Sequence, residues 1–276
     1  MLSLCATPIG NMEDITLRVL IALREADEIW CEDTRHSRLL LDRYEIRKPL
    51  IACHMHNERT RAEQLIPLLQ AGRHICYISD AGMPGISDPG ALLVETCIRE
   101  GLQYEVLPGA SAALMSIVYA GMAEAGRFTF LGFLPRGGKE RSRMIADIAA
   151  CTHPVILYES PHRVRGTLED IRSALGDMQG CLLRELTKKF ECASRGMLSE
   201  LIELCAAEPK GECVLIVDPS TRLNAPDEVP SPESLARDAL SRGLSCRDAA
   251  TEVAALAGIA RREAYELVQR IRDEQV

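Results

Sequence analysis

The stretch Ser79-Asp80-Ala81-Gly82-Met83-Pro84-Gly85-Ile86-Ser87-Asp88-Pro89-Gly90 decides the fold of this chain. It follows the apolar run Ile75–Ile78 and precedes a helical pattern at Ala91–Glu100. Open α/β sheets bind ligands outside the carboxyl ends of their strands. Glycine lets the backbone approach a ligand closely, and proline stiffens the loop. The stretch therefore predicts a ligand-binding loop, with an ordinary turn-rich connection as the alternative.

The first 125 residues alternate between short apolar runs and helical periodicity. Strands are expected at 2–6, 27–31, 49–53, 74–79 and 103–107, and helices at 16–26, 35–44, 58–71, 90–101 and 110–120. Short strands that alternate with helices predict parallel βαβ units in one sheet. Right-handed connections then place helices on both faces of that sheet.

A second α/β unit is expected after a pause rich in glycine and alanine near residue 122. Its strands are expected at 128–134, 155–158, 181–184 and 213–217, and its helices at 139–151, 162–175 and 198–206. Three short helices at 233–242, 246–257 and 261–273 follow a proline-rich segment, and Ser245 is the expected N-cap of the middle one. We therefore predict domains at 1–122 and 123–218, a linker at 219–231, and a helix-turn-helix-like module at 232–276.

Composition narrows the class of protein. The net charge of −8 gives no general attraction for nucleic acid, and the acidic C-terminal module offers little support for DNA binding. However, residues 127–165 carry more basic than acidic side chains, and most basic residues of the chain are arginines, which suit phosphate groups. The chain has no apolar run long enough to span a membrane and no secretion-signal pattern, which predicts a cytoplasmic protein. Its 11 cysteines form no CxxC pair, so we expect buried thiols and no metal.

Polar or small residues follow several of the predicted strands. Glu32–Ser37 follow the second strand, where Thr34 is the candidate helix cap, and Cys53–Glu58 follow the third. Leu107–Ala113 bring small residues to a helix N-terminus, where free backbone N–H groups suit an anion or a ribose. Ala6–Asn11 hold one glycine where a dinucleotide fingerprint needs three, so a nicotinamide or flavin site is not expected.

Charged segments also follow two strands of the predicted second α/β domain. Tyr158–Arg163 and Arg184–Glu191 suggest that this sheet presents its edge to the same crevice. Arg136-Gly137-Gly138-Lys139 form a flexible basic loop suited to a backbone phosphate. A solvated basic face would show the same composition.

Nine of these segments, taken in order, resemble the ribosomal RNA small-subunit methyltransferase I family of the tetrapyrrole-methylase superfamily. They are Ala6–Asn11, Asp14–Thr16, Glu32–His36, His56–Glu58, Ser79–Gly90, Pro108–Ala112, Gly132–Pro135, Glu159–Arg163 and Arg184–Glu191. The resemblance covers residues 1–218, and the C-terminal helices are similar to a module that follows in this family. It implies two α/β domains, the first with a parallel sheet and the second with a mixed sheet, and usually a homodimer.

The resemblance also implies an enzyme that uses S-adenosylmethionine to methylate the 2′-hydroxyl of a cytidine in the decoding region of 16S rRNA. A subunit substrate is expected, because the acidic first domain would bind naked RNA poorly. The cofactor-binding residues it implies are Pro8, Gly10, Asp80, Gly82, Met83, Ser111, Ala112, Tyr158 and Glu185. Met83 replaces a threonine of many relatives, so we expect a backbone or apolar contact there.

The candidate catalytic residues are Arg35, His36, Glu159 and Lys188. Methyl transfer to an alcohol needs in-line approach of the oxygen and removal of its proton. We expect Glu32–His36 and Lys188 to face the acceptor ribose, and Arg35 and the basic residues of 136–143 to bind phosphates, without choosing a base. Two alternatives stay open: methylation of a tetrapyrrole, and a ribosome-assembly factor that binds RNA without a cofactor.

Overall fold

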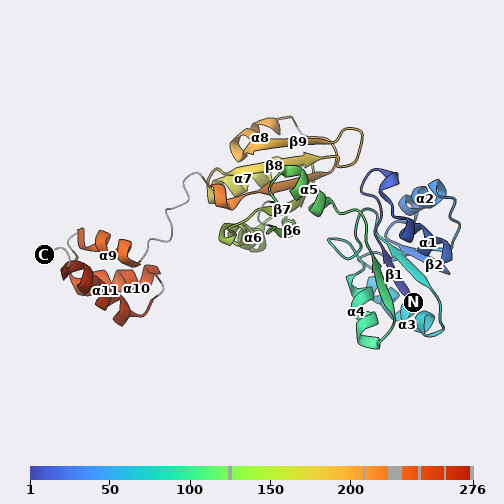
Figure 1. Ribbon diagram of the computed structural model, residues 1–276, viewed down its shortest axis with the longest axis horizontal. Helices are drawn as coiled ribbons and strands as arrows, with labels where there is room; N and C mark the ends of the chain where they lie inside the picture. Colours follow the sequence, from blue (N-terminus) through green and yellow to red (C-terminus); the bar gives the residue numbers. More distant parts are fainter. Residues whose placement is uncertain (124–125, 208, 223–231, 242–243, 258, 274–276) are drawn as a thin grey trace. The chain divides into compact units, whose positions relative to one another are not determined.

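The computed structural model describes residues 1–123, 126–207, 209–222, 232–241, 244–257 and 259–273. The chain divides into two compact units, Met1–Arg222 and Leu223–Val276. The first unit holds two five-stranded sheets, drawn from blue to green and from green to orange in Figure 1. Most of the predicted linker, residues 223–231, lies outside the described residues.

The first sheet is parallel throughout, as the alternating pattern predicts. Its strands are β1 (Leu2–Cys5), β2 (Glu28–Cys31), β3 (Leu50–Ala52), β4 (Ile75–Ile78) and β5 (Tyr104–Leu107), in the order β3-β2-β4-β1-β5. Because β1 and β4 are neighbours and parallel, the loops that follow them leave the same edge side by side. This places the segments 6–11 and 79–90 next to each other.

Helices cover both faces of this sheet, which confirms the prediction. The helices α1 (Leu17–Glu25) and α2 (Thr34–Arg43) pack on one face, and α3 (Glu58–Gln70) and α4 (Ala91–Glu100) pack on the other. Side chains alternate accordingly along β1, since Leu4 joins the core below α3 and α4 and Cys5 joins the core below α1. The cap of α2 is Asp33 and not Thr34, because the Asp33 carboxylate accepts the backbone N–H of Arg35 at 2.8 Å.

The second sheet is mixed, as the family resemblance implies. Its strands are β6 (Thr129–Phe133), β7 (Val155–Glu159), β8 (Gln179–Arg184), β9 (Cys192–Met197) and β10 (Cys213–Val217), in the order β6-β7-β10-β8-β9. Only β6 and β7 run parallel. The sequence did not predict β9, whose residues Cys-Ala-Ser-Arg-Gly-Met lack an apolar alternation; backbone pairing with β8 holds it at the edge.

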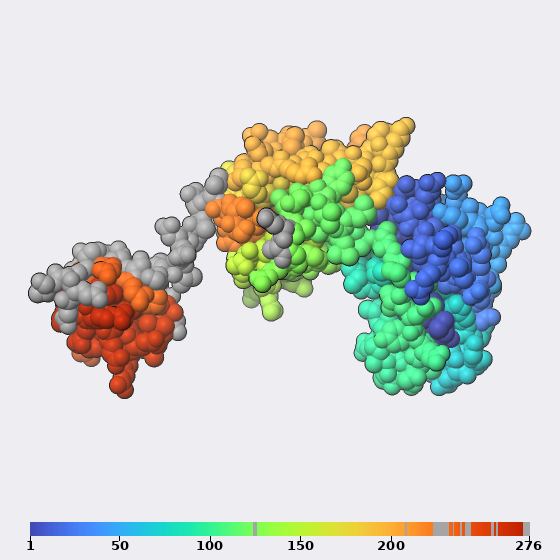
Figure 2. Space-filling model, viewed as in Figure 1, coloured from blue at the N-terminus to red at the C-terminus, as the bar shows by residue number. Residues whose placement is uncertain are grey.

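Helices again cover both faces of the second sheet. One face is covered by α6 (Gly138–Ala150), α7 (Val164–Leu175) and α8 (Leu198–Leu204). The other is covered by α5 (Ala112–Ala120), which follows the first sheet in the chain but packs through Ala113 and Ile117 against β7 and β10. In Figure 2 the surface of the first unit is continuous from its blue part into its green and yellow part.

The domain boundary at residue 122 stays a prediction.

In the second unit the described residues form three helices, as predicted: α9 (Pro232–Ser241), α10 (Cys246–Ala257) and α11 (Arg261–Asp273). They enclose a small core of alanine, valine and isoleucine side chains. Ser245 caps α10 as expected, since its hydroxyl accepts the backbone N–H of Asp248 at 3.2 Å. Over the part of the chain that the structure describes, the helices are too short or too polar to cross a membrane.

Candidate functional site

A cavity of about 600 Å³ lies at the carboxyl ends of the first sheet and is bounded on its other side by the second sheet. Its volume is in the range of small-molecule sites. Its walls include most of the predicted site residues: Asp80, Gly82, Met83, Ser111, Ala112, Tyr158, Glu159, Glu185 and Lys188. Residues far apart in the chain therefore meet around one space.

A smaller cavity of about 370 Å³ adjoins the first. It brings together Pro8, Gly10 and His36. Asp80 and Lys188 line both cavities and so mark the place where they adjoin. Arg35 lies outside both, because its side chain is 90% exposed and forms an ion pair of 2.7 Å with Asp33.

The loop 79–90 is held at both ends. Its start is joined to the loop after β1, since Thr7 and Gly82 exchange two backbone hydrogen bonds of 2.9 and 3.1 Å. At its end, the Glu58 carboxylate accepts the N–H of Gly90 at 2.8 Å. Gly90 has a φ of +127°, and a Cβ there would lie 2.9 Å from the Tyr77 ring. The glycine is therefore needed for both conformation and space, and Glu58 has a structural role.

Three carboxylates form an acidic wall of the larger cavity: Glu32, Asp80 and Asp88. Burial, together with the charges of Glu32 and Asp80, raises the pKa of Asp88 to about 6. Burial and then the Asp80 charge also raise the pKa of Glu32. Among the described residues no salt bridge reaches this acidic wall, and no group of three or more His, Cys, Asp or Glu side chains is arranged to hold a metal ion. Uncompensated negative charge of this kind favours a cationic ligand.

An aromatic and apolar wall faces the same cavity. The ring of Tyr158 meets Phe130 and Phe133 edge to face, with centroid distances of 4.8 and 5.6 Å. Phe133 is exposed and lines the cavity together with Met83 and Ile86. Burial raises the pKa of the Tyr158 hydroxyl, which therefore stays neutral. The wall offers a π surface of the kind that a planar ring system packs against.

A strained loop of the second sheet supplies the charged residues at the point where the cavities adjoin. Lys188 Nζ lies 3.0 Å from Glu185 and 2.9 Å from Glu212. Desolvation lowers the pKa of Lys188, but its hydrogen bonds to Glu212 and Glu185 outweigh that effect and raise the pKa overall. Lys188 is thus held as a cation. Glu185 has a φ of +53°, a conformation that non-glycine residues adopt mainly where the surroundings enforce it.

Gly10 allows the loop after β1 to pack closely against the loop that carries Thr187 and Lys188. A Cβ at Gly10 would lie 2.5 Å from the Lys188 side chain and 2.7 Å from Thr187 Oγ1. The neighbouring N–H of Asn11 donates to the same Thr187 oxygen at 2.9 Å. The close packing of these two segments of the chain is therefore enough to explain a glycine at position 10.

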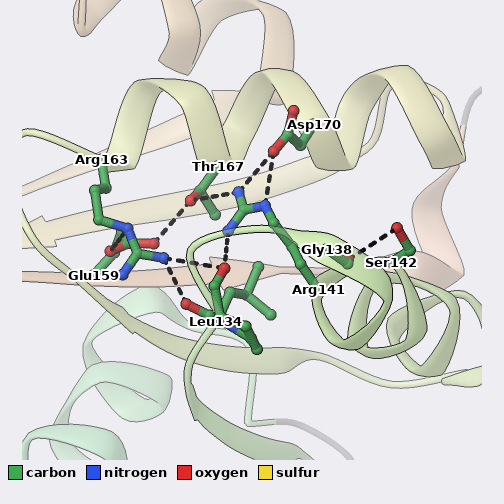
Figure 3. A network of polar contacts seen from close by, with 9 residues as sticks. Leu134, Gly138, Arg141, Ser142, Glu159, Arg163, Thr167 and Asp170 are labelled. Carbon is green, nitrogen blue, oxygen red and sulfur yellow. Dashed lines mark hydrogen bonds and ion pairs between the residues drawn. The ribbon is translucent and has the colours of Figure 1, made fainter.

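Glu159 lies at the rim of the larger cavity, but neighbouring groups occupy its carboxylate. The side chain is fully buried. One oxygen accepts a hydrogen bond of 2.8 Å from the Ser160 N–H. The carboxylate also accepts the Thr167 hydroxyl at 2.8 Å and lies 3.3 Å from Arg163 (Figure 3). These partners satisfy both oxygens without a ligand.

Several cavity residues were missing from the predicted list of site residues. Four of them belong to segments that were singled out from the sequence: Ile86, Ser87 and Asp88 in the loop 79–90, and Phe133 in Gly132–Pro135. Four others are Gly211, Glu212, Cys213 and Val214. Asp88 is the second acidic residue of the loop 79–90, so the composition of that loop carried a signal. Gly211 and Glu212 carried none, because their position follows from β10 being the central strand of the second sheet.

Comparison with protein families and curated proteins places this chain among methylases. Residues 1–202 match the family model described as Tetrapyrrole (Corrin/Porphyrin) Methylases. The ribosomal RNA small subunit methyltransferase I of Halalkalibacterium halodurans is 40% identical over 271 residues, which cover 96% of this chain and 93% of that protein. The protein of the same name from Haemophilus influenzae is 42% identical over 270 residues, covering 96% and 95%. The one from Thermotoga maritima is 42% identical over 217 residues, which cover 78% of this chain and 97% of that protein.

Solved structures share the fold at much lower identity. A diphthine synthase matches with a TM-score of 0.61 and 14% identity, covering 78% of this chain and 88% of that chain. A uroporphyrin III C-methyltransferase from Thermus thermophilus matches with a TM-score of 0.59 and 16% identity, covering 78% and 96%. At such identities the likeness shows a common fold.

Proposed function

Because the chain belongs to the tetrapyrrole (corrin/porphyrin) methylase family, we propose that it is an S-adenosylmethionine-dependent rRNA methyltransferase. The acceptor that we propose is the ribose 2′-hydroxyl of a cytidine in the decoding region of 16S rRNA, within the small ribosomal subunit of the cytoplasm. The names of the curated relatives support an rRNA substrate. The observation that carries the proposal is the pair of adjoining cavities, with an acidic and aromatic wall in one and His36 in the other.

The larger cavity fits the chemistry of this cofactor. S-adenosylmethionine carries a sulfonium and an ammonium, for which the acidic wall of Glu32, Asp80 and Asp88 offers negative charge. Its adenine suits the wall of Phe133 and Tyr158. Its carboxylate suits the N-terminus of α5, where Ser111 and Ala112 line the cavity. When bound, the cofactor supplies an electrophilic methyl group.

The smaller cavity is where we place the acceptor ribose. Pro8, Gly10 and His36 surround it, and Lys188 stands at the boundary with the cofactor cavity. Since its two carboxylate partners keep Lys188 protonated, we assign it to stabilise negative charge on the substrate and not to accept the proton. His36 is the candidate proton acceptor that remains, because its imidazole lines the acceptor cavity.

Basic side chains beside the cavities suit the RNA backbone. Arg136, Lys139 and Arg143 are exposed, and none of them has a salt bridge within the described residues. Arg35 is exposed next to His36. We propose that these side chains bind phosphates that flank the acceptor nucleotide.

We also propose a homodimer. The strand β5 is an edge of the first sheet, and Tyr104 and Val106 on it are exposed. Leu114 and Val118, four residues apart on α5, are exposed as well. Exposed apolar side chains of this kind are typical of surfaces that another protein covers. Sedimentation at equilibrium should give twice the mass of the chain.

The test is transfer of a radiolabelled methyl group from S-adenosylmethionine to small subunits that lack the modification. We expect label in 16S rRNA at one cytidine, and resistance of the following phosphodiester bond to alkali, which marks a 2′-O-methyl group. Asp80→Asn keeps an acceptor for the Asp33 N–H but removes a charge, so we expect a tenfold or greater loss of cofactor affinity, about 1.4 kcal/mol. Asp42→Asn, an exposed site on α2, is the matched control.

Two results would contradict the proposal. Methylation of a porphyrin precursor with no label in RNA would assign the chain to tetrapyrrole methylation. Binding of 16S rRNA without any binding of S-adenosylmethionine, in the presence or absence of subunits, would make it an assembly factor.

A further inference from the structure

Two arginines hold the backbone of the basic loop that joins β6 to α6. Arg163 donates to the carbonyl oxygen of Leu134 (Figure 3). Arg141 donates from Nη1 to the carbonyl oxygen of Pro135 at 2.9 Å. The two carbonyls directly precede Arg136, so the arginines fix the point from which the loop starts.

One buried carboxylate reaches both arginines, Arg163 directly and Arg141 through Thr167. Glu159 lies 3.3 Å from Arg163 Nε through one oxygen and accepts the Thr167 hydroxyl at 2.8 Å through the other. Thr167 Oγ1 in turn accepts from Arg141 Nη2 at 3.1 Å. Asp170 adds a direct ion pair to the same guanidinium, at 2.8 Å from Nε and 2.7 Å from Nη2. Two branches therefore run from Glu159 to consecutive carbonyls of the loop (Figure 3).

The segment 136–139 has few other contacts, of which the Ser142 hydroxyl donating to the carbonyl oxygen of Gly138 at 3.4 Å is one (Figure 3). A Cβ placed on Gly137 or Gly138 would meet no atom within 4 Å apart from chain neighbours and the backbone of its own helix. Arg136 and Lys139 are exposed at either side of this glycine pair. Gly137 and Gly138 lie where the chain enters α6, which begins at Gly138. Glycine has high conformational entropy, so ordering this entry upon binding is costly unless the protein orders it beforehand.

The loop also starts at the rim of the cofactor cavity. Phe133, the last residue of β6, lines that cavity, and so does Glu159. A phosphate held by Arg136 and Lys139 would thus lie beside the entrance to the site. Glu159 reaches the loop from the buried side, through Arg163 and Arg141.

From this geometry we propose that Glu159 is a positioning residue, which acts through Arg163, Thr167 and Arg141 to hold the 136–139 loop ready for an RNA phosphate next to the acceptor nucleotide. The inference rests on the proposed function for the identity of the substrate. It also replaces the expected catalytic role of Glu159. The carboxylate is fully buried and both of its oxygens are held by groups of the protein, with the Arg163 guanidinium paired to it, which fits an anchor better than a proton acceptor.

Glu159→Gln is the first test variant, because it keeps the shape and removes the charge that orients the arginines. We expect the KM for small subunits to rise about 5- to 10-fold, with kcat and cofactor affinity unchanged within about twofold. The plot of log KM against log salt concentration should become less steep, by the amount expected for the loss of about one phosphate contact. Amides 136–139 should exchange hydrogen faster even without RNA.

Thr167→Val interrupts only the branch to Arg141 and should give a smaller change in the same direction. Thr96→Val is its control, since Thr96 is equally buried in the first half and its hydroxyl has no hydrogen-bond partner. A fall in kcat at unchanged KM in Glu159→Gln would make Glu159 catalytic and overturn the inference. Unchanged exchange of amides 136–139 would overturn it as well. If the wild type fails to methylate subunits, the proposed function fails, while the exchange rates still decide whether Glu159 holds the loop.

Discussion

Carboxylates of two kinds line the same cavity and differ in what surrounds them. Glu32, Asp80 and Asp88 stand together without a salt bridge among the described residues, and the pKa values of Glu32 and Asp88 are raised. Glu159 is fully buried, yet Arg163, Thr167 and the Ser160 N–H surround it. A charge left without an ion-pair partner in a folded protein is costly, so its persistence points to a ligand that supplies the opposite charge. A charge with all its partners points to structure.

The difference teaches that lining a cavity does not by itself assign a role. Both kinds would be called site residues from their positions alone. The groups that contact each carboxylate oxygen make the distinction. They show whether a carboxylate can bind a cationic ligand or is already bound to groups of the protein. The following variants test that distinction through opposite effects on stability.

The largest effect is expected from Glu159→Ala. Removing the carboxylate leaves Arg163 without its ion-pair partner and the Thr167 hydroxyl without its acceptor, whereas Arg141 keeps its direct ion pair with Asp170. Breaking a buried ion pair from one side costs about 3–5 kcal/mol, which corresponds to a fall in Tm of about 10 °C for a unit of this size. Thermal unfolding followed by circular dichroism measures it. A change of less than about 2 °C would mean that Glu159 is not a structural anchor.

Asp88→Asn should act in the opposite direction and stabilise the protein without its cofactor. The raised pKa means that the folded state binds a proton more tightly than the unfolded state. The stability that Asp88 contributes is therefore fully present below pH 4 and is lost as pH rises through about 6. At pH 8 we expect the neutral amide to add about 0.5–1 kcal/mol, after allowance for solvent screening of this half-buried group, and to raise Tm by about 2–4 °C.

The pH dependence of that gain provides the control. Toward pH 5 the wild-type carboxyl becomes protonated in the folded state, so the advantage of Asp88→Asn should shrink. A gain of equal size at pH 5 and pH 8 would show that it does not come from the charge of Asp88. A loss at pH 8 would contradict the description of an uncompensated acidic wall.

Lys188→Met should change stability little, although it removes the cation between Glu185 and Glu212. The pair is close to solvent, and such ion pairs contribute about 0.5 kcal/mol or less. We expect methyl transfer to fall tenfold or more while cofactor binding persists, because the lysine stands where the two cavities adjoin. Single-turnover rates and binding isotherms separate the two effects. Full activity of this variant would remove Lys188 from the mechanism.

The smallest effect is expected from Arg35→Ala. Its side chain is almost fully exposed and makes its ion pair with Asp33, and Asp33 keeps its cap to α2 through the backbone N–H of residue 35. Tm and cofactor affinity should stay unchanged, and only the KM for RNA should rise. Loss of cofactor binding in this variant would place the cofactor outside the larger cavity.

Much of the fold could be predicted from the sequence, because buried strands and amphipathic helices carry strong periodicity. All five strands of the first sheet and its parallel direction followed from the alternating pattern. The strand β9 was missed, since an edge strand held by backbone bonds needs no apolar face. The packing of α5 on the second sheet could not be foreseen either, because its small apolar side chains fit either sheet.

The sequence predicted where the site residues lie better than it predicted what each of them does. Strand ends meet at one edge, so Asp80 and Tyr158 could be expected near one cavity. The sequence does not encode which way a side chain turns, and Arg35 turns to its neighbour Asp33 and away from both cavities. Nor does it show that Gly10 serves contact with Lys188 and Thr187.

The central claim is that the acidic wall binds the methyl donor and that Glu159 does not. Calorimetric titration of S-adenosylmethionine into the wild type, Asp80→Asn and Glu159→Gln tests it directly. The account predicts binding to the wild type, a tenfold or greater loss of affinity in Asp80→Asn, and affinity within about twofold of wild type in Glu159→Gln. Equal binding by Asp80→Asn and the wild type, or loss of binding in Glu159→Gln, would contradict it.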